Sequence, residues 1–84
     1  MGFLNDMEKI RISIEKDREV MQFEVAEYLH HEGDRCKFDI FKNGEFVVGL
    51  EPDAHEYLRI CKNPGILDEE VIYLIADKIE ALQL

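Results

Sequence analysis

The stretch that most constrains this chain runs from Cys36 to Leu50, CKFDIFKNGEFVVGL, where two apolar-alternating runs meet at Asn43-Gly44. Asn-Gly between such runs is the strongest short-range signal for a β-hairpin. A two-residue turn there would pair Phe41 with Phe46, and it would divide the apolar residues between both faces of the hairpin. The pattern therefore favours a longer loop.

The favoured loop is Lys42-Asn43-Gly44, a type I turn in which Gly44 adopts positive φ and forms a G1 bulge. In this register the apolar residues share one face: Cys36, Phe38, Ile40, Phe46, Val48 and Leu50. Phe41 and Val47 then stand on a mixed face, where Gly49 leaves room for a group to approach closely. We expect a hairpin over 36–50 with this turn.

A second alternating pattern precedes the hairpin, because polar residues separate Ile10, Ile12 and Ile14. β-branched residues at period two are typical of a half-buried strand, so we expect a third strand near 9–15. One long helix over 4–31 is the alternative, but it would place Asp17 in the middle of its apolar stripe. A third strand would also support the hairpin, since an isolated two-stranded hairpin is marginally stable.

Asp17 is better interpreted as the N-cap of a helix over 18–32 that ends at Gly33. The apolar residues of this helix have helical spacing: Val20, Met21, Val25, Tyr28 and Leu29.

The segment 54–62 predicts a short helix, because Asp53 and Glu56 have the spacing of a capping box. An edge strand with Leu58 and Ile60 facing inward is the alternative.

A C-terminal helix is predicted over 68–82, with acidic residues in its first turn. Besides one apolar stripe, this helix carries a second apolar side formed by Ile72, Tyr73 and Ala76. A surface helix in a monomer needs only one such stripe. The second side therefore suggests a contact with another chain.

Length and charge limit the classes of function. With 84 residues and 9.9 kDa the chain is expected to be one α+β domain over 1–84. A net charge of −9 repels phosphate backbones, so a nucleic-acid partner is not expected. No apolar run is long enough to cross a membrane. Two widely spaced cysteines do not suggest a disulfide scaffold, and a cytoplasmic location is the default expectation.

The candidate chemical groups are two cysteines and three histidines: Cys36, Cys61, His30, His31 and His55. None of them form the short pairs that begin a zinc site, and Cys61 with His55 has no signature of a nucleophilic pair. Small apolar core cysteines and solvated histidines explain them better. We expect no metal, no cofactor and no catalytic residues.

The remaining signal is apolar surface at five residues: Phe41, Val47, Ile72, Tyr73 and Ala76. Two such places on a small chain suggest a partner surface. The sequence therefore predicts a small acidic protein–protein interaction or regulatory module, which binds a protein partner or forms a homodimer through its C-terminal helix. The alternative is a metal- or redox-responsive protein that uses Cys36, Cys61 and a histidine.

Overall fold

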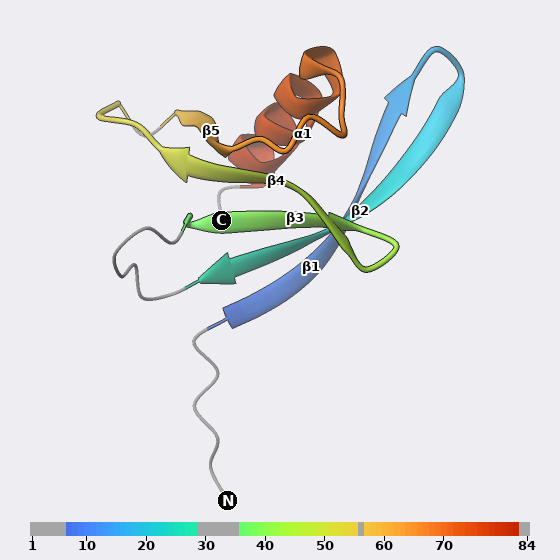
Figure 1. Ribbon diagram of the computed structural model, residues 1–84. Helices are drawn as coiled ribbons and strands as arrows, with labels where there is room; N and C mark the ends of the chain where they lie inside the picture. Colours follow the sequence, from blue (N-terminus) through green and yellow to red (C-terminus); the bar gives the residue numbers. More distant parts are fainter. Residues whose placement is uncertain (1–6, 29–35, 56, 83–84) are drawn as a thin grey trace, which may run out of the picture.

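The computed structural model describes residues 7–28, 36–55 and 57–82. It contains five strands followed by one helix: β1 (Met7–Lys16), β2 (Glu19–Tyr28), β3 (Phe38–Lys42), β4 (Glu45–Pro52), β5 (Leu58–Lys62) and α1 (Glu69–Leu82). The strands form one antiparallel sheet in the order β1-β2-β3-β4-β5, and α1 packs on one of its faces (Figure 1). The predicted α+β class and the predicted C-terminal helix are confirmed.

The core lies between α1 and one face of the sheet. Alternate residues of the strands supply one side of it, chiefly Ile12, Ile14, Phe23, Val25, Phe38, Ile40, Val48 and Leu50. The helix supplies Val71, Ile72, Ile75, Ala76 and Ile79. Successive side chains of a strand point to opposite faces, so the other face of the sheet carries the polar residues of β1 and β2.

The first hairpin confirms one prediction and corrects another. The strand expected near 9–15 is present as β1, but the helix expected over 18–32 is wrong, because residues 19–28 form β2. Met21, Phe23 and Val25 alternate with polar residues, and they pair across the strands with the isoleucines of β1. This pairing extends the apolar row of β1 across a second strand. The end of the predicted helix, including Leu29 and Gly33, lies outside the described residues.

The turn of this hairpin consists of Asp17 and Arg18, with φ values of 53° and 69°. Asp17 is therefore a turn residue and not a helix N-cap. Two successive residues with positive φ are typical of a type I′ turn, whose twist matches that of the strands it joins.

The second hairpin pairs β3 with β4, but the predicted G1-bulge loop is wrong. Asn43 and Gly44 form a two-residue turn with φ values of 53° and 83°, and Phe41 lies opposite Phe46. The positive φ predicted for Gly44 is thus present in a different turn. The register then shifts, so that Ile40 lies opposite Val48.

This register shift leaves Val47 as the extra residue of a bulge within β4. Val47 and its neighbour Val48 are both buried, at 1% and 0% exposure. The bulge inside β4, rather than the turn, thus places Val48 and Leu50 on the same face of the sheet as their partners Ile40 and Phe38. Because of the shift Leu50 lies opposite Phe38.

The segment 54–62 forms no helix in its described part, and the alternative of an edge strand is confirmed as β5. Leu58 and Ile60 pack against the core, as that alternative requires. Asp53 does not cap a helix, since its side chain accepts hydrogen bonds from the backbone N–H groups of His55 at 2.8 Å and Tyr57 at 3.0 Å. Glu56 lies outside the described residues.

Cys36 and Cys61 form a disulfide, with their Cα atoms 5.9 Å apart, so they are not two separate small apolar residues as interpreted, although Cys36 is buried as expected. The bond lies over Gly49, where an added Cβ would stand 2.6 Å from Sγ of Cys36. The room that Gly49 was expected to leave is therefore occupied by this disulfide.

Replacing Arg18 with Gly should stabilise the protein by up to about 1 kcal/mol, because the left-handed conformation is costly for a residue with a Cβ and free for glycine. Chemical denaturation measures the change. Arg18→Ala is the matched control, since alanine keeps the cost while losing the same side chain. Equal stability of the two variants would contradict a strained turn.

Gly49→Ala should destabilise the protein by roughly 1–3 kcal/mol, because the new methyl group overlaps Sγ of Cys36. The penalty should shrink in a Cys36→Ala/Cys61→Ala background, where the sulfur atoms are gone. A double-mutant cycle of unfolding free energies measures this coupling. Additive effects would show that the disulfide is not what excludes a side chain at position 49.

Candidate interaction surface

Three of the five predicted surface residues lie in the core of the chain itself. Val47, Ile72 and Ala76 are 1%, 0% and 6% exposed, so the expectation that they form apolar surface is wrong. The bulge turns Val47 inward. Ile72 and Ala76 belong to the same wide face of α1 as the residues of the predicted stripe, and the sheet covers that whole face.

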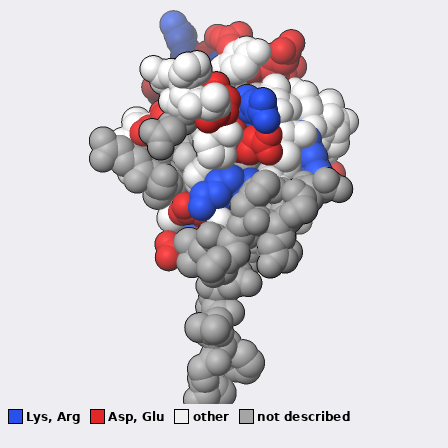
Figure 2. Space-filling model, turned by 90° about the vertical axis from the view of Figure 1, so that its left-hand side faces the viewer, with Lys and Arg blue, Asp and Glu red and all other residues white. Residues whose placement is uncertain are grey.

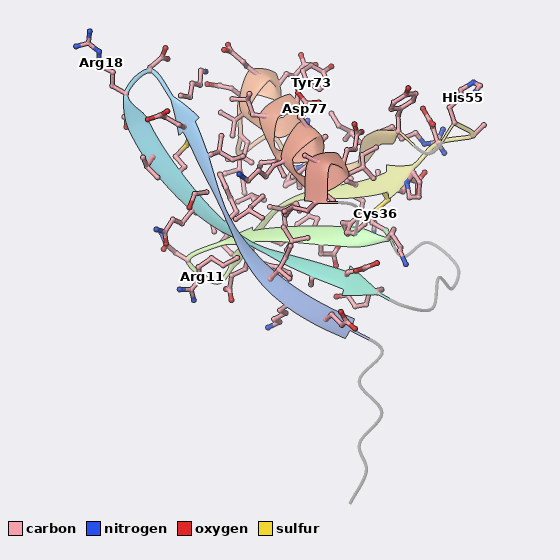
Figure 3. The ribbon with its side chains drawn as sticks, turned by 180° about the vertical axis from the view of Figure 1, so that it is seen from behind. Arg11, Arg18, Cys36, His55, Tyr73 and Asp77 are labelled. Carbon is pink, nitrogen blue, oxygen red and sulfur yellow. A yellow bond between two sulfur atoms is a disulfide. The ribbon has the colours of Figure 1, made fainter. Side chains whose placement is uncertain are left out.

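The two remaining residues lie on different parts of the molecule. Tyr73 is 57% exposed on the outer side of α1, near Asp77, and its hydroxyl donates to Oε2 of Glu69 at 3.4 Å (Figure 3). Phe41 is half-buried on the sheet face opposite the helix, where its ring meets that of Phe46 edge to face with centroids 6.0 Å apart. The structure does not bring these two residues into one surface.

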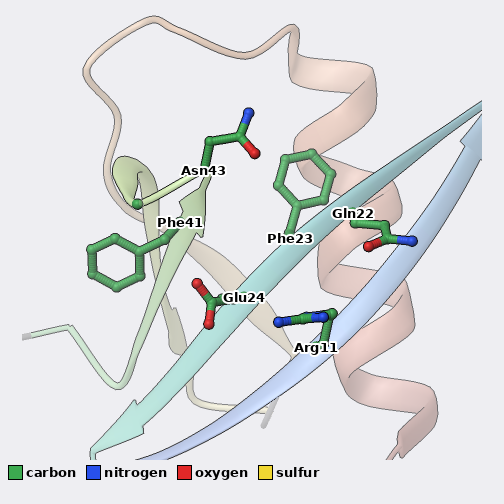
Figure 4. Close-up of a pocket in the computed structure, with 7 residues that line it drawn as sticks. Arg11, Gln22, Phe23, Glu24, Phe41 and Asn43 are labelled. Carbon is green, nitrogen blue, oxygen red and sulfur yellow. The ribbon is translucent and has the colours of Figure 1, made fainter.

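Phe41 lines an open hollow of about 390 Å³ beside the turn between β3 and β4 (Figure 4). Its polar lining comes mainly from Arg11, Gln22, Glu24 and Asn43. Arg11 and Glu24 lie directly opposite one another on β1 and β2, so their charges are complementary within the chain. The hollow can offer hydrogen bonds and an aromatic ring, but it holds no nucleophile beside a base.

The candidate metal ligands are not assembled in the part of the chain that the structure describes. No group of three or more His, Cys, Asp or Glu side chains there could hold a metal ion. Both cysteines are in the disulfide, and His55 is exposed in the turn between β4 and β5 (Figure 3). His30 and His31 lie outside the described residues.

The longest unpaired surface of the sheet is the outer edge of β1. This ten-residue strand pairs with β2 on one side, and no described strand pairs with its other side. The backbone N–H of Tyr28 donates to the carbonyl oxygen of Lys37 at 2.9 Å, so even-numbered residues of β2 point their backbone groups towards β3. Odd-numbered residues of β2 therefore bond to even-numbered residues of β1.

It follows that the odd-numbered residues of β1 direct their N–H and C=O groups outward, namely Lys9, Arg11, Ser13 and Glu15. An edge of this kind is a template for another strand. Sequence reasoning found β1 from its isoleucines but not its place at the edge, because residues 18–32 were expected to form a helix and not the neighbouring strand.

A shallow, open groove lies beside this edge, between β1 and α1. Its volume is about 410 Å³, and its lining residues are Ser13, Ile14, Glu15, Leu74, Asp77, Lys78 and Ala81. Leu74 is half-buried against the core, and Ala81 is exposed. A strand added to β1 would place every second side chain over this groove.

Charge is distributed unevenly between β1 and the rest of the chain. The chain has a net charge of −9, whereas β1 carries three basic and two acidic residues. At the N-terminal end of α1, Nζ of Lys16 lies 3.5 Å from Oε2 of Glu70 and 3.9 Å from Oδ2 of Asp68. Figure 2 shows basic and acidic side chains intermixed on the face that it draws. The edge of β1 is thus less repulsive to another acidic chain than the molecule as a whole.

Neither a membrane-spanning helix among the described residues nor a known relative gives a further guide to function. Among the described residues, no helix has the length and apolar character needed to span a membrane. No known family model matches the chain, and no curated protein or solved structure matches it. Function is therefore inferred from the geometry of the chain itself.

Proposed function

We propose that this chain is a small acidic protein–protein interaction or regulatory module, without catalytic activity of its own, that binds an extended protein segment at the edge of β1. The observation that carries the proposal is a ten-residue strand edge with a groove beside it. Strand addition obtains affinity from main-chain hydrogen bonds and specificity from pockets for alternate side chains. The edge of β1 would supply the main-chain hydrogen bonds, and the groove beside α1 would contact every second side chain.

The edge of β1 lacks two devices that commonly block strand addition. Its pairing with β2 contains no bulge, and the strand contains no proline. It is also longer than the typical strand of about five or six residues. Among the described residues its protection rests on charged side chains, and these also allow selection of a partner with matching charges.

The groove indicates which side chains the bound segment would present. Those on the helix side would contact Leu74 and Ala81, so apolar residues are favoured there. Those on the opposite side would lie near the charged side chains of Lys9, Arg11 and Glu15, so polar residues are favoured. The preferred ligand is therefore a segment in which apolar and polar residues alternate.

Selection from a library of displayed random decapeptides should yield binders with such alternation. On binding, the amide protons of Lys9, Arg11, Ser13 and Glu15 should become protected from hydrogen exchange, because they would donate to the added strand. Ser13→Pro should abolish binding, since proline lacks the outward N–H and is tolerated at an edge.

Ser13→Thr is the matched control, because threonine keeps that N–H and suits a strand. It should bind the selected peptides like the unchanged protein. Peptides that bind equally well to the proline variant, or that protect amides elsewhere, would contradict strand addition at β1.

A second candidate function follows from the disulfide. We propose the cytoplasm as the location of the chain, and cytoplasmic thiols are kept reduced, so a disulfide that forms there is commonly redox-sensing. Cys36–Cys61 links β5 to the residues before β3. Oxidation would thereby fix the short edge strand β5 to the sheet. This proposal keeps the redox-responsive alternative of the two cysteines, but it needs no histidine.

Reduction of the disulfide should lower the free energy of unfolding by about 3 kcal/mol, because the bond closes a loop with a sequence separation of 25. Thermal unfolding with and without dithiothreitol measures the effect. Cys36→Ser/Cys61→Ser should unfold like the reduced protein and should not respond to the reductant. Equal stability of the oxidised and reduced forms would remove the basis for a redox response.

A further inference from the structure

The sequence of β1 is nearly complementary to itself when it is read in the antiparallel direction. Glu8 to Lys16 reads EKIRISIEK, with Ile12 at its centre. Positions equally distant from Ile12 carry opposite charges, or both are isoleucine, in all cases but one. The exception is Arg11 with Ser13, which are both polar.

A two-fold axis perpendicular to the sheet would place β1 of a second copy beside β1 with the same faces on the same side. Only residues of equal parity can then lie opposite each other. Centred on Ile12, the cross-strand pairs are Glu8 with Lys16, Lys9 with Glu15, Ile10 with Ile14, and Arg11 with Ser13. Every pair is compatible in charge and polarity.

The neighbouring registers are less compatible. A centre at Arg11 places this arginine opposite its own copy and Glu8 opposite Ile14. A centre at Ser13 places Ile10 opposite Lys16. Like charges directly opposite one another are destabilising, and so is a charge set against an isoleucine on the face that packs on the helix. The register centred on Ile12 is therefore favoured over both.

Two charges of β1 have no charged residue directly opposite them within their own chain. Lys9 lies opposite Ala26 and Glu15 lies opposite Val20 on β2, whereas Arg11 lies opposite Glu24. Pairing with a second copy would place each of these two residues opposite the other. Their backbone groups face outward, so the pair would also exchange main-chain hydrogen bonds.

The groove beside α1 fits the same arrangement. Ile10 of a second copy would lie opposite Ile14, next to the groove lined by Leu74 and Ala81. Ile10 and Leu74 are only half-buried within one chain. Each copy would cover the partly exposed isoleucine of the other, which removes apolar surface from water at two equivalent places.

We infer that the segment bound at the edge of β1 is β1 of a second copy, in the antiparallel register centred on Ile12. This inference rests on the proposed strand addition and names its partner. The product is a dimer with one continuous ten-stranded sheet, and the α1 helices of both copies lie on the same face. The dimer interface is thus β1 with the groove, not the buried residues Ile72 and Ala76.

The test is sedimentation equilibrium at low ionic strength with charge-reversed variants of the Lys9–Glu15 pair. Lys16 is less suitable, because Asp68 and Glu70 already surround it. Lys9→Glu and Glu15→Lys should each weaken dimerisation roughly tenfold or more, since each creates two like-charge pairs across the two-fold axis. The double variant Lys9→Glu/Glu15→Lys should restore it.

Lys62→Glu is the matched control, because it makes the same change in net charge as Lys9→Glu on an exposed residue of β5, at the other edge of the sheet. It should leave dimerisation nearly unchanged. Ser13→Pro should give a monomer. Equal weakening by Lys62→Glu, or no restoration in the double variant, would overturn the register.

A protein that stays monomeric up to about 1 mM would overturn self-pairing altogether. If decapeptides still bind at β1 in that case, strand addition stands and only its partner has been misidentified. If neither association is found, both proposals fail. The two measurements therefore distinguish the failure of the inference from the failure of the proposed function.

Discussion

The burial of one sheet face under α1 is the contact on which the rest of this structure depends. It requires each strand to present its apolar residues on the same side. On β1 and β2 the alternation of the sequence meets this requirement without irregularity. On β4 it does not, since Phe46 and Val48 have equal parity but Phe46 lies opposite Phe41, on the face away from the helix. The bulge at Val47 is the adjustment that keeps Val48 and Leu50 under α1.

The sequence predicts those elements whose local pattern agrees with their final environment. The isoleucines of β1 have the period of a strand, and Val71 to Ile79 have the period of a helix, so both elements were expected. Residues 19–28 carry both patterns, because Met21 and Val25 are four apart and also alternate with polar residues. Pairing with β1 decides between the two patterns. The turn is also hard to predict, because Asp17-Arg18 lacks the glycine that a type I′ turn usually contains. Long-range pairing thus overrides the local signal.

The surface is harder to predict than the fold, because exposure depends on what covers each element. The sequence suggests Ile72 and Ala76 as a second apolar side of α1 because a narrow apolar stripe is enough for a surface helix. Five strands cover a wider one, and both side chains are buried. The disulfide was missed for a similar reason, since a sequence separation of 25 does not reveal that the fold brings the two cysteines together beside Gly49. The free edge of β1 has no local signal at all, because it is a property of strand order.

The two edges of the sheet differ in a way that favours a closed dimer. β1 offers ten residues and β5 only five. Pairing of β1 with β5 of the next copy is a head-to-tail contact, so it would produce a ring or an open fibre rather than a symmetric dimer. Symmetric pairing of β1 with β1 uses both long edges at once and leaves only the short β5 edges at the ends of the sheet. The high negative charge of the chain as a whole then acts against further association. An edge that would be hazardous in a neutral protein is in this way confined to one symmetric contact.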